Sequence, residues 1–471
     1  MTMDEHTLMD YVTRQRWYGA KSRTVSHAEV LDTVTIRQAE PQLSLALVEM
    51  RFDTGAHDIY QLLFAGGGEG IPLDGLDEDA AIAREIVSAM RTGLTLQGSQ
   101  GVAEFSPAED FSALGRELGA ARLVSSEQSN SSVVFDEALI LKIFRRLEPG
   151  INPELEMLRF LTEHGFRNIP ALAGWYGYSG GPLTATLGLL QDFVAGAIGG
   201  WELALGEIAL APESLLDRLG RLGEVTANMH TALGSDQNDL AFAPEEPSVE
   251  SLGLLTATVD EEIARVFLSL PEDDERLAPI LGRGEEVREQ LRLLTHAGSS
   301  GRVIRTHGDY HLGQTLWRRP PDALGGRELR PSGTGFAGAA SSHGDWILLD
   351  FEGEPARTLV ERRRKRSPLR DVAGMLRSFA YAATAAELTR GADVPVDWEE
   401  RARERFLESY LETVDPTLLP PGDAAVERLL AVFELEKAVY ELRYELDNRP
   451  DWVGIPVAGI ERLMHQAAEA L

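Results

Sequence analysis

The sequence predicts an α+β protein of two lobes with an additional β-rich domain at its N-terminus. Alternating apolar residues, as in Leu43–Phe52, indicate half-buried strands in the first part of the chain. Helical periodicity dominates after Trp201, as in Leu215–Leu233. Among the later helices, a polar loop at Arg305–Gln314 is followed by an apolar strand that ends in Asp350.

Composition restricts the possible classes of protein. The chain has 471 residues, of which 43% are hydrophobic and 25% charged, so it is globular and long enough for two or three folding units. A formal net charge of -30 disfavours nucleic acid and anionic membranes as partners. The absence of cysteine excludes disulfides and thiolate sites. No signal peptide or long apolar run is evident, so we expect a cytoplasmic protein.

Three regions are expected: a cap domain at residues 1–95, an N-lobe at 96–196 and a mainly helical C-lobe at 197–471. The cap opens with a short amphipathic helix and the cluster Arg16-Trp17-Tyr18. Trp and Tyr beside Arg are typical interface anchors, so this cluster is expected to dock the cap on its neighbour rather than bind a ligand.

A polar loop of small residues precedes a hairpin in the N-lobe. The hairpin strands are Val133–Phe135 and Leu139–Phe144. Small side chains let backbone N–H groups approach phosphates, which makes Ser129, Asn130 and Ser131 candidate nucleotide-binding residues. Ser/Asn clusters are more often plain turns, so the loop alone is a weak signal.

Lys142 strengthens that interpretation, because a cation inside an apolar strand is costly unless it is paired. A phosphate-facing Lys held by a helix carboxylate would explain it. The helix that begins at Asn152-Pro153 offers Glu156 as the expected partner and Glu154 as the alternative. A Lys that reaches solvent from an edge strand is the remaining alternative.

The segment Leu187–Val194 indicates a buried strand that leads into the glycine-containing stretch beyond it. In a two-lobed kinase this would be the hinge whose backbone contacts the adenine. Gln191 and Phe193 are the candidate residues.

The loop and strand of the C-lobe carry the parts that phosphoryl transfer needs. Asp309 fits the base that orients and deprotonates a hydroxyl, and Gln314 and Asp350 fit an amide and a carboxylate that hold Mg²⁺. The offset of five from Asp309 to Gln314 equals that of the protein-kinase catalytic loop. In the alternative interpretation, Asp309 caps a turn and Asp350 ends a buried strand. That alternative does not explain why these two residues and Gln314 occur together at this spacing.

A late helix places Lys437, Tyr440, Glu441 and Tyr444 on one face through steps of three and four residues. Aromatic rings with charged neighbours fit a sugar, while a packed helix with surface hydroxyls fits the spacing equally well. His230, near a helix end, is interpreted as structural. The Pro/Gly/Ser-rich stretch 317–345 is expected to be a long surface connection.

Residues 357–370 form a basic segment, with six Arg and one Lys. Local neutralisation of phosphates and simple pairing with the acidic surface both remain open for it. A nucleic-acid site there is disfavoured by the overall charge.

Taken together, these segments resemble the actinobacterial maltokinases, which are similar in turn to the aminoglycoside phosphotransferases. The motifs that carry the resemblance run almost from end to end of the chain: Arg16-Trp17-Tyr18, Glu127–Ser131, Leu141–Arg146, Gly150–Pro153, His307–Gln314, Asp350–Pro355, Ser367–Gly374 and Lys437–Glu441.

The resemblance implies a bilobal, protein-kinase-like (aminoglycoside phosphotransferase-like) fold with an N-terminal cap domain. It implies ATP-dependent phosphorylation of maltose at its anomeric hydroxyl, with ATP and Mg²⁺ as cofactors and a functional link to trehalose synthase and maltosyltransferase enzymes. Asp309 would be the base, Gln314 and Asp350 the magnesium ligands, and Lys142 the phosphate-binding lysine. His311, Lys437, Tyr440, Tyr444 and Glu441 would line the sugar site.

Other functions stay open on the sequence. Glucosamine kinases resemble this family and share its catalytic parts, so glucosamine, or another small hydroxylated acceptor of aminoglycoside type, is the nearest alternative. A catalytically silent kinase-like binding module is an alternative of another class. The intact set Lys142, Asp309, Gln314 and Asp350 disfavours it.

Overall fold

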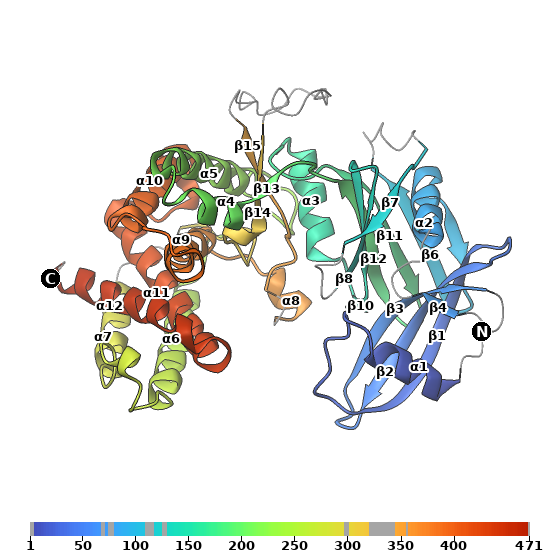
Figure 1. Cartoon of the computed structure of the whole chain (residues 1–471), viewed down its shortest axis with the longest axis horizontal. Coiled ribbons are helices and arrows are strands. Elements are labelled where there is room, and N and C mark those ends of the chain that lie inside the picture. The colour runs from blue at the N-terminus through green and yellow to red at the C-terminus, as the bar shows by residue number, and fades with distance from the viewer. Residues whose placement is uncertain are drawn as a thin grey trace. The chain divides into compact units, whose positions relative to one another are not determined.

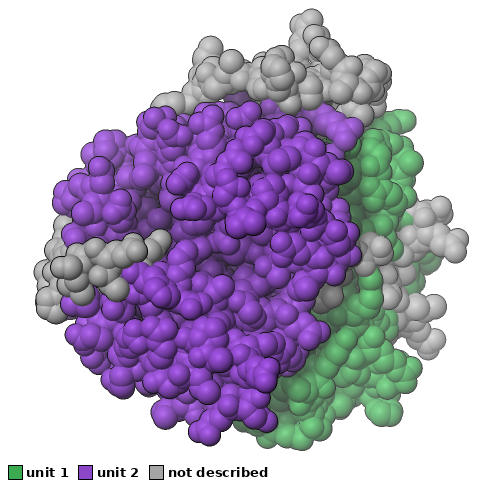
Figure 2. Space-filling view, turned by 60° about the vertical axis from the view of Figure 1, so that its left-hand side comes forward, with its two compact units in different colours: residues 1–162, 169–196 green, residues 163–168, 197–471 purple. Residues whose placement is uncertain are grey.

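The computed structural model describes residues 4–66, 71–73, 80–108, 117–124, 130–295, 301–319, 344–354 and 357–469. The chain forms two compact units, one of Met1–Thr162 with Ile169–Gly196 and one of Glu163–Asn168 with Ala197–Leu471 (Figure 2). The first unit contains both the predicted cap and the predicted N-lobe, and the boundary near residue 95 stays a prediction. Ser129 and most of the connection at 317–345 lie outside the described residues.

The first sheet of this unit is antiparallel and has the order β1-β2-β3-β10, with β4 beside β3 (Figure 1). Its strands are β1 (Val25–Arg37), β2 (Leu43–Phe52), β3 (His57–Ala65), β4 (Ile71–Leu73) and β10 (Arg146–Leu147). Helix α1 (Glu5–Thr13) packs on it through Leu8 and Val12, which share a core with Val48 and Tyr60. The predicted strands in this region are confirmed.

The second sheet has the order β5-β6-β11-β12-β9-β8-β7 and is also antiparallel. Its strands are β5 (Thr95–Gln97), β6 (Gly101–Pro107), β7 (Ala121–Leu123), β8 (Asn130–Phe135), β9 (Leu139–Phe144), β11 (Leu172–Gly180) and β12 (Thr184–Asp192). Helices α2 (Ala81–Thr92) and α3 (Pro153–Glu163) accompany it. The predicted hairpin is β8 and β9.

Buried polar side chains join the two sheets. Gln61 of β3 donates from Nε2 to the carbonyls of Phe144 (2.9 Å) and Leu187 (2.8 Å) in the second sheet, and its Oε1 accepts from Tyr176 (2.9 Å). The Trp17 ring lies 5.3 Å from the Arg145 guanidinium. Trp17 is buried, as expected of a docking residue.

The second unit is mainly helical, as predicted. Its helices are α4 (Gly200–Glu207), α5 (Pro212–Leu233), α6 (Val249–Leu268), α7 (Gly284–Thr295), α8 (Leu359–Arg362), α9 (Leu369–Arg390), α10 (Trp398–Thr413), α11 (Asp423–Asn448) and α12 (Gly454–Glu469). The described residues also form the 3₁₀ turns η2 (Glu275–Leu277), η3 (Leu312–Gln314), η5 (Pro416–Leu418) and η6 (Pro450–Trp452). A small antiparallel sheet consists of β13 (Ile198–Gly199), β14 (Thr315–Arg318) and β15 (Asp345–Leu348).

Helix α11 is the centre of this unit. Its apolar residues, among them Val439 and Leu442, share one core with residues of α6, α7 and α12. Helices α6, α10 and α12 were not specifically predicted from the sequence. None of the described helices is both long enough and apolar enough to cross a bilayer.

Candidate active site

The loop between Ile304 and η3 holds Asp309 in the second unit. Gly308 adopts φ +86°, a left-handed conformation that favours glycine, so the chain turns sharply just before Asp309. Tyr310 follows, buried, with its hydroxyl 2.7 Å from Thr226 Oγ1 of α5. The turn and the buried Tyr310 together fix the backbone on both sides of Asp309, whose side chain is 27% exposed.

Asp371 of α9 holds this loop in place by accepting two of its backbone N–H groups, and we call this contact the clamp. Its Oδ2 accepts the backbone N–H of His307 at 2.7 Å, and its Oδ1 accepts that of Gly308 at 3.0 Å. The His307 ring is bonded separately, with Nε2 2.8 Å from the carbonyl of Leu349 after β15. No local sequence pattern indicates this role of Asp371, because the contact joins segments about sixty residues apart.

Asp371 keeps its negative charge although it is buried. Burial by itself raises the pKa of this carboxyl, but hydrogen bonds from His230 and from backbone N–H groups outweigh that effect and hold its pKa below the usual range. His230 lies with Nε2 3.2 Å from Asp371 Oδ2 and Nδ1 3.0 Å from the Tyr410 hydroxyl. His230 is therefore structural, as expected, and supports the loop through Asp371.

The two predicted metal ligands lie together. Gln314 ends η3, and its Nε2 is 2.9 Å from Asp350 Oδ2. Asp350 adopts φ +61°, which is uncommon for a residue with a side chain and is found often at functional sites. Carboxylate and amide oxygens suit Mg²⁺, so the donor set fits the ion once the Gln314 amide presents Oε1 in place of Nε2.

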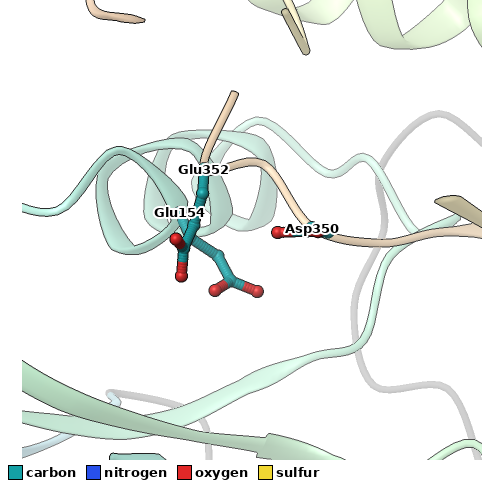
Figure 3. Close-up of side chains that lie close together, drawn as sticks. All are labelled: Glu154, Asp350 and Glu352. Atoms are coloured by element: carbon teal, nitrogen blue, oxygen red, sulfur yellow. The ribbon is translucent and has the colours of Figure 1, made fainter. Parts of the chain in front are cut away.

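Glu352 is a further carboxylate that the sequence analysis did not select. It projects, like Asp350, from the loop after β15, while Glu154 projects from α3 (Figure 3). Carboxylate oxygens of Asp350 and Glu352 lie within 4.8 Å of each other. In the sequence, Glu352 is marked only by its position two residues after Asp350, a predicted metal ligand.

The predicted sugar residues of α11 reach Asp309 through Lys437. Lys437 Nζ lies 3.9 Å from Asp309 Oδ1 and 5.8 Å from the Tyr440 ring centroid. His311 Nε2 lies 3.9 Å from Asp309 Oδ2, and desolvation holds the pKa of His311 below its ordinary value. Tyr444, one turn further along α11, is 44% exposed. The structure thus gathers Asp309, His311, Lys437 and Tyr440.

Glu441 departs from that expectation. Its Oε2 accepts from Nε (3.0 Å) and Nη2 (2.7 Å) of Arg377, a fully buried residue of α9. Because a carboxylate bonded twice by a buried guanidinium is held in place, we correct the role of Glu441 from sugar binding to fastening α11 against α9.

The basic segment at 357–370 is paired within the second unit. Arg357 donates to Glu354 (2.6 Å), Lys365 to Glu245 (2.6 Å) and Arg370 to Glu436 (2.9 Å). Burial, together with the neighbouring cations Arg370 and Arg357, lowers the pKa of Arg366 to about 10. These pairs favour the interpretation in which the segment complements acidic side chains.

In the first unit, Lys142 of β9 is ion-paired, as expected, but with the alternative partner. Lys142 Nζ lies 2.6 Å from Glu154 Oε1, and Glu154 is 1% exposed. Asn152 caps the start of α3 by accepting the N–H of Glu154 (2.8 Å). Glu156 lies two residues further, about 200° around the helix, so the first choice of partner was wrong.

The described part of the predicted phosphate loop begins at Asn130, where β8 starts. Asn130 and Ser131 stand opposite Phe144 and Ile143 of β9. Ser131 Oγ accepts from Arg145 Nε at 2.8 Å. Their contact with a nucleotide stays a prediction, and Ser129 lies outside the described residues.

In the predicted hinge, the backbone groups of Phe193 are already hydrogen-bonded within the chain. The backbone N–H of Phe193 donates to Ala138 O (2.8 Å), and its carbonyl accepts from Ala195 N–H (3.0 Å). Both backbone groups therefore already form hydrogen bonds within the chain, and a contact of Phe193 with adenine stays a prediction. Gln191 is 5% exposed, and among the described residues its Oε1 has no hydrogen-bond partner.

Two family models match separate parts of the chain. Residues 120–326 match the phosphotransferase enzyme family, and residues 11–93 match the maltokinase N-terminal cap domain. A glucosamine kinase of Streptacidiphilus jiangxiensis is 27% identical over 353 residues, 72% of each chain. A glucosamine kinase of Mycolicibacterium smegmatis is 25% identical over 365 residues, 73% of this chain and 80% of that one.

Solved structures share the fold. A glucosamine kinase structure aligns with a TM-score of 0.71 at 19% identity, over 97% of this chain and 99% of the other. Another, of a glucosamine kinase with glucosamine, ADP and inorganic phosphate, aligns with a TM-score of 0.69 at 19% identity, over 96% and 98%. The predicted kinase-like fold is confirmed. The chain is thus similar to the phosphotransferase enzyme family over residues 120–326 and to the maltokinase N-terminal cap domain over residues 11–93.

Proposed function

We propose that the protein is an ATP-dependent sugar kinase that phosphorylates maltose at its anomeric hydroxyl, giving maltose 1-phosphate and ADP. The observation that carries the choice of acceptor is the 3.9 Å separation between Lys437 Nζ and Asp309 Oδ1. An ammonium fixed beside the proposed base favours an uncharged acceptor. The functional link to trehalose synthase and maltosyltransferase enzymes belongs to the same proposal.

In the proposed reaction, Asp309 accepts the proton of the acceptor hydroxyl. That oxygen forms a bond to the γ-phosphorus while the bond between this phosphorus and the β-phosphate oxygen breaks, releasing ADP. Such transfer depends mainly on positioning and on charge stabilisation. Lys142, held by Glu154, supplies positive charge to the phosphates. Mg²⁺, when bound by Gln314 and Asp350, would neutralise phosphate charge.

The expected repulsion between Lys437 and a charged acceptor can be given a magnitude. Two unit charges about 4 Å apart interact by about 1 kcal/mol in water and about 4 kcal/mol near a protein surface. Lys437 is 39% exposed, so solvent screens its charge and the lower half of that range applies. A protonated amino sugar placed beside Lys437 should therefore be disfavoured by about tenfold or more.

Glucosamine kinase activity is the second candidate. Two relatives carry that name, at 27% and 25% identity. The structure offers the carboxylate of Glu354, whose pKa burial raises but Arg357 and Lys437 lower to a net value below the usual range. Arg357 already holds that carboxylate at 2.6 Å, which leaves it poorly disposed to receive an amino group.

The test is ADP release from Mg-ATP with maltose, glucose, glucosamine and trehalose, beside a control without acceptor. We expect turnover with maltose to exceed turnover with glucosamine by at least tenfold in kcat/KM. Preferential turnover of glucosamine would replace the proposed acceptor while retaining the kinase. No release of ADP with any sugar would remove the sugar-kinase proposal.

A further inference from the structure

A cavity lies in the second unit, apart from the residues proposed for catalysis. It has a volume of about 340 Å³ and is lined by parts of α9, α10, η6 and α12. That volume is in the range of pockets that hold small ligands. Asp309, His311, Gln314, Asp350, Lys437, Tyr440 and Tyr444 are all absent from its lining.

One wall of the cavity is the indole of Trp452. The Arg449 guanidinium lies 5.1 Å from the indole centroid, and the Tyr381 ring is stacked with it at 6.1 Å. Glu445 holds both neighbours, accepting from Arg449 Nε (2.9 Å) and from the Tyr381 hydroxyl (3.0 Å). The indole is therefore held in place before any ligand arrives, and it gives the cavity one apolar, rigid wall residue.

Positive and negative side chains are equal in number in the lining of the cavity. Arg377 and Arg462 contribute two cations, and Glu399 and Asp451 contribute two carboxylates. Arg462 Nη1 donates to Glu399 at 2.6 Å, so this pair is neutral as a whole. A balanced lining gives no net attraction to an anion or a cation, but it offers donors and acceptors to a ligand rich in hydroxyl groups.

Arg377 provides donors that point to a ligand. It is 2% exposed, and within the described part of the chain its hydrogen bonds use Nε and Nη2, to Glu441 and to the carbonyl of Ile455. The two N–H groups of Nη1 remain for a ligand. A Cβ at position 459 would lie only 2.1 Å from this nitrogen, so the glycine there is what leaves room for the Arg377 guanidinium.

We propose that this cavity is a second carbohydrate-binding site, which takes a neutral hexose or a short oligosaccharide of neutral hexoses. The indole wall, the balanced charges and the buried Nη1 donors match that class of ligand. Arg377 also fastens Glu441, which lies on α11 beside Tyr440, so a sugar bound here contacts the residue that positions the proposed acceptor helix. Any effect of that contact on turnover depends on the proposed function. The existence of the binding site does not depend on it.

The test is calorimetric titration of the full chain with maltose and with glucose, without nucleotide. We expect two binding events. Ala458 is an exposed lining residue, so Ala458→Trp should close the cavity and remove one event, with kcat retained. The matched control Ala458→Ser should keep both. Tyr440→Ala should remove the other event only.

A single event in the unaltered protein, or two events that survive Ala458→Trp, would overturn the proposal. Trp452→Leu provides a second variant, expected to weaken the same event at least tenfold with an unchanged melting temperature. Titration with inorganic phosphate separates sugar from anion binding, and an event with phosphate that Ala458→Trp abolishes would also overturn it. Failure of the sugar-kinase proposal appears separately, as absent ADP release.

Discussion

Asp371 accepts the backbone N–H of His307 at 2.7 Å, and through this bond α9 sets the conformation of the loop that carries Asp309. The clamp is buried and charged, and His230 and Tyr410 extend it into α5 and α10. The position of the proposed base therefore depends on a carboxylate that is not among the residues proposed to bind sugar or nucleotide. The predictions that follow separate such positioning residues from those proposed to act on substrate.

Asp371→Asn should lower kcat by about ten- to a hundredfold and leave the Michaelis constants for ATP and maltose within about threefold. The amide replaces one accepting oxygen with a donor, so only one of the two backbone N–H bonds can remain. Steady-state kinetics at saturating ATP would check this. An unchanged kcat in a folded variant would show that the clamp does not position Asp309.

Asp309→Asn should reduce kcat by about a hundredfold or more, because a general base contributes about that much. ADP binding should persist, since Asp309 is not among the proposed phosphate-binding residues. Calorimetry with Mg-ADP is the control for the nucleotide site. Turnover within tenfold of the unaltered protein would remove Asp309 as the base.

Glu154→Gln should raise the Michaelis constant for ATP at least tenfold, because it removes the charge that holds Lys142. Glu156→Gln is the matched control: the same chemical change two residues along α3, expected to alter that constant by less than threefold. Equal effects of the two substitutions would contradict the assigned pairing. The Michaelis constant for maltose should stay unchanged in both.

Lys437→Met should change the choice of acceptor. Without the ammonium 3.9 Å from Asp309, the ratio of kcat/KM for maltose to that for glucosamine should fall by at least tenfold. Lys437→Arg keeps the charge and serves as the control, with a ratio close to that of the unaltered protein. A ratio unaffected by Lys437→Met would show that this charge does not discriminate between acceptors.

Asp32 should make the first unit sensitive to acid. It accepts from Ser99 N and Oγ (both 2.7 Å), Gln100 N (3.0 Å) and the Tyr178 hydroxyl (2.6 Å). Burial raises its pKa, but these bonds outweigh burial and leave the pKa below 3.8. Its stabilisation is therefore complete above the unfolded pKa and is lost as pH falls through the lower folded pKa.

Asp32→Asn should accordingly lower the free energy of unfolding by about 2 kcal/mol at pH 7, the size expected for hydrogen bonds to a charged group. The difference between the two proteins should shrink below about pH 4. Urea denaturation at pH 7 and at acid pH measures it. A difference that stays constant over this range would contradict the charged role of Asp32.

Much of the architecture follows from local pattern. Apolar alternation located β2, and helical spacing located α5 and α11, because burial of one face determines both patterns. The spacing from Asp309 to Gln314, followed by the apolar strand, correctly brought Gln314 and Asp350 together. The proximity of these two side chains could therefore be predicted, and their role as metal ligands stays a prediction.

Contacts between segments that are distant in the sequence could not be predicted. Glu154 and Glu156 both suit a lysine, and only the rotation of α3 relative to β9 decides between them. Glu441 shares a helical face with Lys437, but no local sequence pattern shows that Glu441 forms an ion pair with Arg377 of α9. The clamp by Asp371 and the cavity beside Trp452 likewise arise from helices that meet only in the folded chain.

The most direct test of the central claim follows the reducing end of maltose during turnover. Phosphorylation at the anomeric hydroxyl blocks that end, so a copper-reduction assay should record one reducing end lost for each ADP released from Mg-ATP. Treatment with alkaline phosphatase should restore it. Release of ADP with the reducing ends of maltose unchanged would contradict the claim, because the phosphate would then lie on another hydroxyl or on water.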